Sequence, residues 1–241
     1  MSHSITLVSH CFCYSRLLCW QLSSLITNPP QCSVRIEVWH TTSDSRTVAC
    51  LRWFAGQTWP ANITLAPREL PDQQLFRRAI GRNLSALATT ADFLWLADCD
   101  HLFGPGCLDS IPQAIAASGK PDAPLFFPRI VHKTTHETGD SMIASIDAPR
   151  IVHFPPEDFA PERLNRAIGG IMIVPGDIAR TKGYLPTSRR YQRPATTWKR
   201  TTCDVAYRNS LGVRRGVAID LQGVYRITHS QQGRNTIGLE L

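Results

Sequence analysis

The stretch that decides the fold is residues 93–101, which reads FLWLADCDH. Its first five residues, 93–97, have the length and the unbroken hydrophobicity of a strand buried on both faces of a parallel sheet. Two carboxylates, Asp98 and Asp100, follow directly. Ligands of open α/β sheets bind at the carboxyl edge, where strands stop and loops open. We therefore expect these two acids to face a ligand.

Asp98 and Asp100 are two residues apart, so on an extended chain their side chains point in opposite directions. A turn at Gly104-Pro105-Gly106 would let both approach one ligand. Carboxylate oxygens suit Mg²⁺ or Mn²⁺ ions that bridge to phosphate oxygens. The pattern predicts such a site, and the alternative is a helix N-cap beside a solvated acid.

Strand and helix patterns alternate in the first half of the chain. Asp72 is positioned to cap a long helix, and the Asn28-Pro29-Pro30 run ends an earlier one. The alternation predicts a doubly wound, mostly parallel, Rossmann-like α/β sheet with helices on both faces. The expected strands are 5–8, 33–39, 63–65 and 93–97, and the expected helices are 14–26, 43–54 and 72–87.

The second half is less regular. The absence of an internal repeat or a Pro/Gly/Ser-rich linker favours a single domain over 1–241. The expected strands are 124–131, 168–174, 217–221 and 224–227, the expected helices are 176–183 and 203–211, and the expected loops are 132–147 and 187–202.

Composition excludes several classes of protein. With 241 residues, 43% hydrophobic and 19% charged, the chain is typical of a soluble globular protein rather than a disordered one. The most apolar early stretch, 5–26, is interrupted by His10, Arg16 and Gln21, so we expect no membrane span and no signal peptide. The eight cysteines form no C-x-x-C pair, which predicts buried free thiols, no zinc site and a cytoplasmic location.

Positive charge is concentrated at the end of the chain. The formal net charge is +7, and residues 178–241 carry twelve basic and three acidic side chains, against nine and eight in residues 1–120. Such an excess suits a nucleotide diphosphate, a nucleic acid or a phosphorylated acceptor, and the alternative is a basic face that only adds solubility.

The densest basic segment is 187–200, which holds five basic residues, no acid, and the aromatic residues Tyr191 and Trp198. Two functional interpretations remain open beside that of a disordered loop. The segment is a lid that closes on a donor diphosphate, or it follows a nucleic-acid backbone while its aromatic rings stack on bases. Both interpretations make Arg189, Arg190 and Trp198 candidate binding residues, and we assign them to acceptor binding.

Four blocks of sequence stand out between residues 78 and 229. The first runs from RAIGRN at 78–83 into LWLADCDHLFGPG at 94–106, where an Arg-Asn pair opens a helix that leads to the D-x-D strand. The others are GGIMIVPGDIARTKGYL at 169–185, CDVAYR at 203–208 and YRITH at 225–229. Together the four blocks resemble the family 2-like, inverting members of the nucleotide-sugar-dependent glycosyltransferases of GT-A fold, and they follow that family's order.

The resemblance implies a metal-dependent inverting glycosyltransferase that uses a nucleotide sugar such as a UDP-sugar, with a nucleotide-sugar-binding half at 1–108 and an acceptor-binding half at 109–241. It leaves open whether a hexosyl or a pentosyl group is transferred. The roles that it implies are catalytic base for Asp204, ligands of Mn²⁺ or Mg²⁺ for Asp100, Asp98 and His229, donor binding for Asp98, Arg82 and Asn83, and acceptor binding for Gly169 and Gly170.

The chain departs from the family pattern in two places. In the family, an aspartate that binds the nucleobase usually follows the second strand. Here the nearest acid is Asp44, which we take as a displaced donor-binding residue. The usual acidic pair is reduced to Cys203-Asp204, so Asp204 alone is left to accept the proton of an acceptor hydroxyl.

Alternatives remain for both the acceptor and the reaction class. The acceptor is a saccharide by family default, and a hydroxylated base in DNA is the alternative that the basic end favours. A nucleotidyltransferase would use the same acids, but it needs a glycine-rich phosphate loop after the first strand, and residues 9–13 contain no glycine. A non-catalytic binding module is the third alternative.

Overall fold

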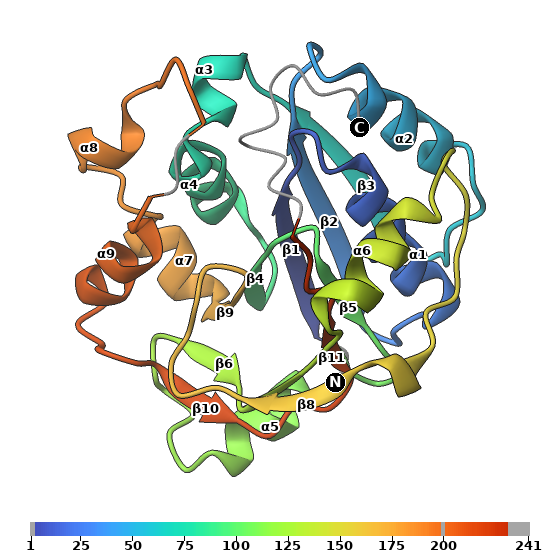
Figure 1. The fold of residues 1–241 in the computed structure, drawn as a ribbon. Coiled ribbons are helices and arrows are strands. Elements are labelled where there is room, and N and C mark those ends of the chain that lie inside the picture. The colour runs from blue at the N-terminus through green and yellow to red at the C-terminus, as the bar shows by residue number, and fades with distance from the viewer. Residues whose placement is uncertain (1–2, 199–200, 231–241) are drawn as a thin grey trace.

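The computed structural model describes residues 3–198 and 201–230, and Figure 1 shows helices on both sides of a central sheet. The main sheet has the strand order β10-β6-β9-β4-β1-β2-β3. This is the predicted mostly parallel α/β sheet in one compact domain. Its strands are β1 (Ser4–His10), β2 (Ser33–His40), β3 (Ile63–Glu69), β4 (Phe93–Ala97), β6 (Phe126–Pro128), β9 (Ile171–Pro175) and β10 (Val217–Ile219).

Strand β1 lies at the centre and pairs in parallel with both β2 and β4. Ile5 is the register partner of Val34 on one side and of Phe93 on the other. Residues 94–97 of β4 are fully buried, as an unbroken apolar strand requires. Because β1, β2 and β4 run in one direction, their carboxyl ends share one edge of the sheet.

Strand β9 reverses direction between β4 and β6 and pairs antiparallel with both. The turn into the following helix requires Gly176, because a β-carbon there would collide with the carbonyl oxygen of Ala91. The amide of Gly176 donates to the Asp92 carbonyl at 2.7 Å. This contact fixes the end of β9 beside the amino end of β4. Because β9 is antiparallel to β4, the segment before β9 lies at the carboxyl end of β4.

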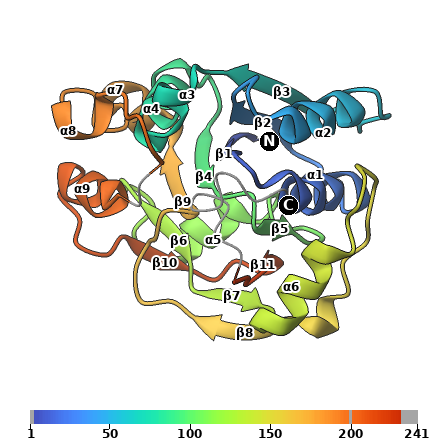
Figure 2. The same cartoon turned by 45° about the horizontal axis from the view of Figure 1, so that its top comes forward.

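Nine α-helices cover the two faces of the main sheet in the described part of the chain. Figure 2 shows α4, α7, α8 and α9 on one side of the molecule and α1, α2 and α6 on the other. Each group packs its apolar side chains into its own core cluster. The first comprises α1 (Ser15–Thr27), α2 (Ser45–Ala55), α5 (Ile111–Ala117) and α6 (His136–Ala144), and the second comprises α3 (Asp72–Leu75), α4 (Arg78–Ala88), α7 (Gly176–Lys182), α8 (Arg189–Gln192) and α9 (Cys203–Ser210).

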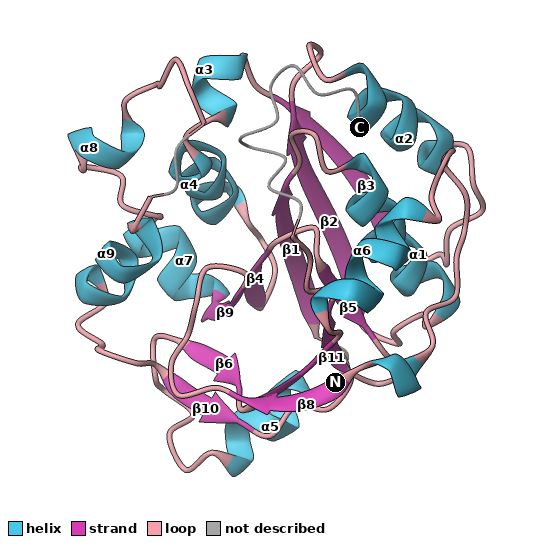
Figure 3. Cartoon of the chain, in the orientation of Figure 1, coloured by secondary structure: helices cyan, strands magenta, loops and turns pink. Residues whose placement is uncertain are grey.

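A second sheet was not predicted from the sequence. It has four strands in the order β5-β11-β7-β8, all labelled in Figure 2; β5, β8 and β11 are also labelled in Figure 3. Strand β11 pairs antiparallel with β5 and parallel with β7, and this brings Arg226 opposite His101. Its elements are β5 (His101–Phe103), β7 (Ile130–Lys133), β8 (Ala160–Arg163) and β11 (Val224–Arg226), and the 3₁₀ helix η1 (Pro156–Asp158) precedes β8.

Three predicted elements are corrected by the structure. The helix expected over 72–87 is two helices, because Arg77 leaves the helical conformation at φ −112°, ψ 83°. Asp72 lies in the first turn and accepts hydrogen bonds from the Thr41 and Ser43 hydroxyls instead of capping one long helix. The strand expected over 124–131 is split into β6 and β7, and the loop expected over 132–147 contains α6, capped by Thr135.

The described part of segment 187–202 also differs from the expected loop, because it contains α8; residues 199–200 lie outside the described residues. All eight cysteines are free thiols, and all except Cys13 are buried, as predicted. Among the described residues, no helix is long and apolar enough to cross a membrane.

Candidate functional site

The two acids after β4 diverge at a tight turn. The His101 amide donates to the Asp98 carbonyl at 3.1 Å, so the chain turns at the acids themselves and not first at Gly104. Gln21 from α1 stabilises this turn by donating to the carbonyls of Asp98 and His101. The two carboxylates consequently face different sets of cationic partners.

Asp98 is held by two arginines of α4. Its Oδ1 accepts from Arg78 Nη1 at 2.8 Å and from Arg82 Nη2 at 3.1 Å. Burial by itself would raise the pKa of Asp98, but the guanidinium charges of Arg78 and Arg82 outweigh it and hold that pKa well below its usual range. The Asp98 side chain is 31% exposed, and its Oδ2 takes no hydrogen bond from the described residues.

The predicted Arg82-Asn83 pair connects α4 to the segments before and after β9. Arg82 is fully buried, and its Nη2 also donates to the Gly169 carbonyl at 2.7 Å. Asn83 Oδ1 accepts from the Tyr184 amide at 2.9 Å, and Arg82 Nη1 donates to the hydroxyl of the same tyrosine. Arg82 and Asn83 therefore fix the backbone at Gly169 and Tyr184 next to Asp98.

Because Gly169 and Gly170 have no side chains, the backbone before β9 can approach the acids closely. A β-carbon on Gly170 would lie 3.0 Å from Asp98 Oδ2 and still closer to the His101 ring. A β-carbon on Gly169 would lie 3.7 Å from Arg82 Nη1, 3.9 Å from Arg78 Nη2 and 3.9 Å from Asp204 Cβ. The structure therefore brings Asp204 to the same small region as the arginines that hold Asp98.

Asp204 lies in the first turn of α9, as the sequence predicts. Its nearest cation is Arg208 Nη1, 4.0 Å away, and the Asp204 side chain is 24% exposed. Arg208 uses its shorter contacts for the backbone, where it donates to the carbonyls of Ala167 and Arg214. The Asp204 carboxylate thus stays accessible to a hydroxyl group.

Asp100 is tied into the second sheet. Its Oδ2 accepts from Arg226 Nε at 2.8 Å, and its Oδ1 lies 2.9 Å from His101 Nδ1. Burial would raise the pKa of Asp100, but the Arg226 charge and the contacts with His101 keep that pKa well below its usual range. Asp100 is only 6% exposed, and its Oδ1, although close to His101 Nδ1, has no hydrogen-bond partner among the described residues.

The described residues contain no group of three His, Cys, Asp or Glu side chains that could hold a metal ion. The predicted ligands Asp98, Asp100 and His229 are thus not assembled as a protein-only metal site. The His229 ring lies edge-on to Tyr14, with 5.7 Å between the ring centroids. Mg²⁺ is commonly held by one or two carboxylates together with substrate phosphates. Asp98 Oδ2 fits that arrangement.

Asp44 and Trp198 occupy internal positions. Asp44 caps α2 by accepting from the Thr47 amide, and it also accepts from the Cys13 amide and the Thr47 hydroxyl, which does not support a contact with a nucleobase. Trp198 is 6% exposed and stacks on Phe12 with 5.6 Å between ring centroids. By contrast, Arg189 and Arg190 are exposed.

Sequence analysis missed three residues of the site. Arg78 and Arg226 lie inside two of the blocks quoted above, RAIGRN and YRITH, but they were given no role, because their pairing with the acids depends on long-range contacts. His10 ends β1 at the same sheet edge, and its two ring nitrogens are buried without hydrogen-bond partners in the described residues. Burial, followed by the charges of Arg82 and Arg78, holds the pKa of His10 well below its usual value. Its position after an apolar strand was the available signal.

No protein-family model and no curated protein matches the chain in sequence. Solved structures do match its fold. A mannosyltransferase from Pyrobaculum calidifontis, PcManGT, in complex with GDP-Man and Mn²⁺, aligns over 96% of this chain and 59% of its own, with 12% identity and a TM-score of 0.59.

TarS 1-349 of S. aureus aligns over 94% of this chain and 60% of its own, with 10% identity and a TM-score of 0.55. The chain therefore spans less than two thirds of the length of either protein. At this level of sequence identity, the similarity is one of fold. The chain has the fold of this mannosyltransferase and of TarS.

Proposed function

We propose that the chain transfers a sugar from a nucleotide-sugar donor to an acceptor hydroxyl, with inversion at the anomeric carbon. The observation that carries the proposal is the neighbourhood of Gly169. One position there lies within 4 Å of Asp204 and of both guanidinium groups that hold Asp98. A proton acceptor and a strongly ionised carboxylate thus meet at the carboxyl edge of the sheet, where ligands of α/β folds bind.

Asp204 is the proposed base. It accepts the proton of the acceptor hydroxyl while that oxygen attacks the anomeric carbon, and the bond from this carbon to the nucleoside diphosphate breaks. A single displacement of this kind inverts the anomeric configuration. The accessible carboxylate of Asp204, with its nearest cation at 4.0 Å, suits a base that must take and release a proton.

Asp98 is the proposed donor-side residue. Its Oδ2 is the oxygen available to share a divalent cation, Mn²⁺ or Mg²⁺, with the donor diphosphate. When bound, such a cation neutralises charge that develops on the leaving diphosphate. Arg78 and Arg82 keep Asp98 ionised and fix its direction, which is the contribution of the chain itself.

The likeness to the mannosyltransferase bound to GDP-Man and Mn²⁺ supports a nucleotide-sugar donor and a divalent cation. The acceptor is a separate question. A saccharide is the default for enzymes of this reaction class, and DNA is the alternative raised by the basic end of the chain. Whether a hexosyl or a pentosyl group is transferred depends on the donor that is accepted.

The test is turnover of a panel of UDP- and GDP-sugars in the presence of Mn²⁺, measured as release of the nucleoside diphosphate. We expect at least one donor to be cleaved, and Asp98→Asn to abolish the Mn²⁺-dependent part of the rate. Asp220→Asn is the matched control, because Asp220 is 73% exposed and pairs with Arg129 at the surface. Absence of turnover with every donor, with and without candidate acceptors, would contradict the proposal.

A further inference from the structure

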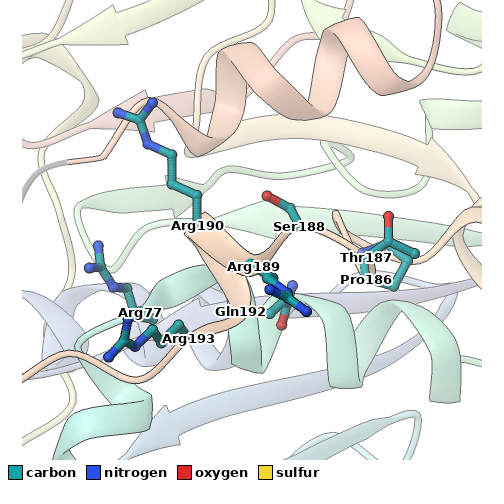
Figure 4. A pocket seen from close by; sticks show the side chains of 8 residues that line it. All are labelled: Arg77, Pro186, Thr187, Ser188, Arg189, Arg190, Gln192 and Arg193. Carbon is teal, nitrogen blue, oxygen red and sulfur yellow. The ribbon is translucent and has the colours of Figure 1, made fainter.

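Four arginines line one open cavity of about 650 Å³ beside the candidate site. Arg77 comes from the turn before α4, and Arg189, Arg190 and Arg193 come from α8 and the residue after it, as Figure 4 shows. Ser188 adds a hydroxyl group to the lining, and no Asp or Glu of the described chain contributes to it. The cavity is therefore strongly positive.

The positive charge of this arginine cavity is not neutralised inside the protein. None of its four arginines forms an ion pair with an acid of the described residues, whereas Arg78, Arg82 and Arg226 each pair with one. Arg77 Nε is buried and has no hydrogen-bond partner there. Unpaired guanidinium groups around one cavity are suited to phosphate oxygens, which they bind with two parallel hydrogen bonds.

The arginine cavity is held in place by the backbone around it. Gln192 Nε2 donates to the carbonyls of Ala79, Tyr184 and Leu185, which links α8 to α4 and to the segment after α7. The Ala195 amide donates to the Gln73 carbonyl at 2.8 Å. The arginines of α8 are thus presented from a segment with defined contacts, so less ordering is needed when a ligand binds.

The aromatic residues of this segment do not face the ligand side. Tyr191 is 8% exposed, and its hydroxyl lies 3.0 Å from that of Thr202. Trp198 packs between Phe12 and Phe76. Stacking on nucleobases needs an accessible ring face, and neither of these two rings offers one.

We propose that the arginine cavity binds a phosphate group of the acceptor, which makes the acceptor a phosphate-bearing molecule recognised without base stacking. The identification of the bound molecule as the acceptor rests on the proposed function, whereas phosphate binding rests on the cavity alone. Arg77 and Arg78 are consecutive, and the first lines the cavity while the second holds Asp98. A phosphate in the cavity would therefore anchor a molecule beside the site of transfer.

The test measures binding of two fluorescent probes to the full chain at low salt. One probe is a deoxythymidine octamer, and the other is an octamer of the same sugar-phosphate backbone without bases. We expect the two affinities to agree within about threefold and to fall with rising salt. Arg77→Ala combined with Arg193→Ala should weaken both by about tenfold or more, because hydrogen bonds to charged groups are lost.

The matched control is Arg214→Ala combined with Arg215→Ala, which removes the same charge from two exposed residues outside the cavity. It should weaken binding by less than about threefold. Equal losses in both double variants, or no loss in the cavity variant, would overturn the cavity as the binding site. A preference of tenfold or more for the octamer with bases would overturn recognition by phosphate alone and favour a nucleic-acid acceptor.

Turnover of nucleotide sugars is measured in parallel to separate the two proposals. Cavity-dependent probe binding in a chain that cleaves no donor would contradict the proposed function and leave the phosphate site standing. Donor cleavage without cavity-dependent probe binding would contradict the phosphate site and leave the proposed function standing.

Discussion

Arg226 Nε donates to Asp100 Oδ2 at 2.8 Å, and this bond ties the end of β11 to the turn after β4. The Ile227 amide adds a backbone bond to the Asp100 carbonyl at 2.8 Å. Asp100 is therefore a junction between the two sheets, whereas Asp98 is the more exposed of the two acids, and its Oδ2 takes no hydrogen bond from the described residues. The two carboxylates of the D-x-D pattern have different surroundings in this structure.

Asp100→Ala should reduce stability. Removing one partner of a buried ion pair leaves the other charge uncompensated, and because Arg226 is 33% exposed we expect a loss of about 2–3 kcal/mol in the free energy of unfolding. Urea denaturation measures it. Asp220→Ala, which breaks an exposed pair with Arg129, should cost less than about 1 kcal/mol. Equal stabilities of the two variants would contradict the role of Asp100 as a junction.

Asp204→Asn should separate binding from chemistry. The amide keeps the shape of the side chain but cannot accept the proton, so we expect the transfer step to slow by about 100-fold or more. The affinity for the nucleotide should stay within about threefold of the original, because Asp204 lies on the acceptor side. Single-turnover kinetics beside nucleotide titration measures both. Asp177→Asn, in the exposed first turn of α7, is the control. An unchanged transfer rate would place the base elsewhere.

His10 should make stability depend on pH below neutrality. Its folded-state pKa is held well below the usual value by burial and by Arg82 and Arg78, so the unfolded chain binds a proton that the folded chain excludes. Stability is therefore lost as the pH falls below about 6.5, the pKa of an unperturbed histidine. In His10→Phe the slope between about pH 6.5 and 5 should be shallower by up to about 1.4 kcal/mol per pH unit. Denaturation at several pH values would show identical slopes if His10 had no such effect.

Trp198→Ala should act mainly on folding. The ring is buried against Phe12 and Phe76, and deleting a buried tryptophan side chain typically costs about 3–5 kcal/mol. Trp198→Phe should keep most of the stability and bind the sugar-phosphate probe within about threefold of the original protein. Loss of probe binding in the stable Trp198→Phe variant would restore the predicted contact between this ring and the acceptor.

The parts of the fold that the sequence predicted are those with a local signal. Strand β4 is predicted residue for residue, because five apolar residues between polar ones allow few alternatives. Helix α6 was missed because HETGDSMIA has little apolar periodicity, and Thr135, which caps it, is a weak signal by itself. All four residues of β8 are exposed, so the strand has no hydrophobic alternation to reveal it.

Sequence analysis singled out the acids of the candidate site, but it did not predict which basic residues pair with them. Asp98, Asp100 and Asp204 stand out because acids end an apolar strand or begin a helix. Arg226 meets Asp100 across 126 positions of sequence, through a second sheet that no local pattern announces. Arg82 was expected near the donor, and its complete burial under Gly169 depends on the packing of α4 against the segment before β9.

The most direct measurement is calorimetric titration of the full chain with UDP and with GDP, each with and without Mn²⁺, because it needs neither the sugar nor the acceptor. If Asp98 Oδ2 shares a cation with the donor diphosphate, Mn²⁺ should strengthen binding of one nucleotide by about tenfold or more. Asp98→Asn should remove this gain, and Asp220→Asn should keep it. No binding of either nucleotide, or an Mn²⁺ gain that survives Asp98→Asn, would contradict the proposed donor site.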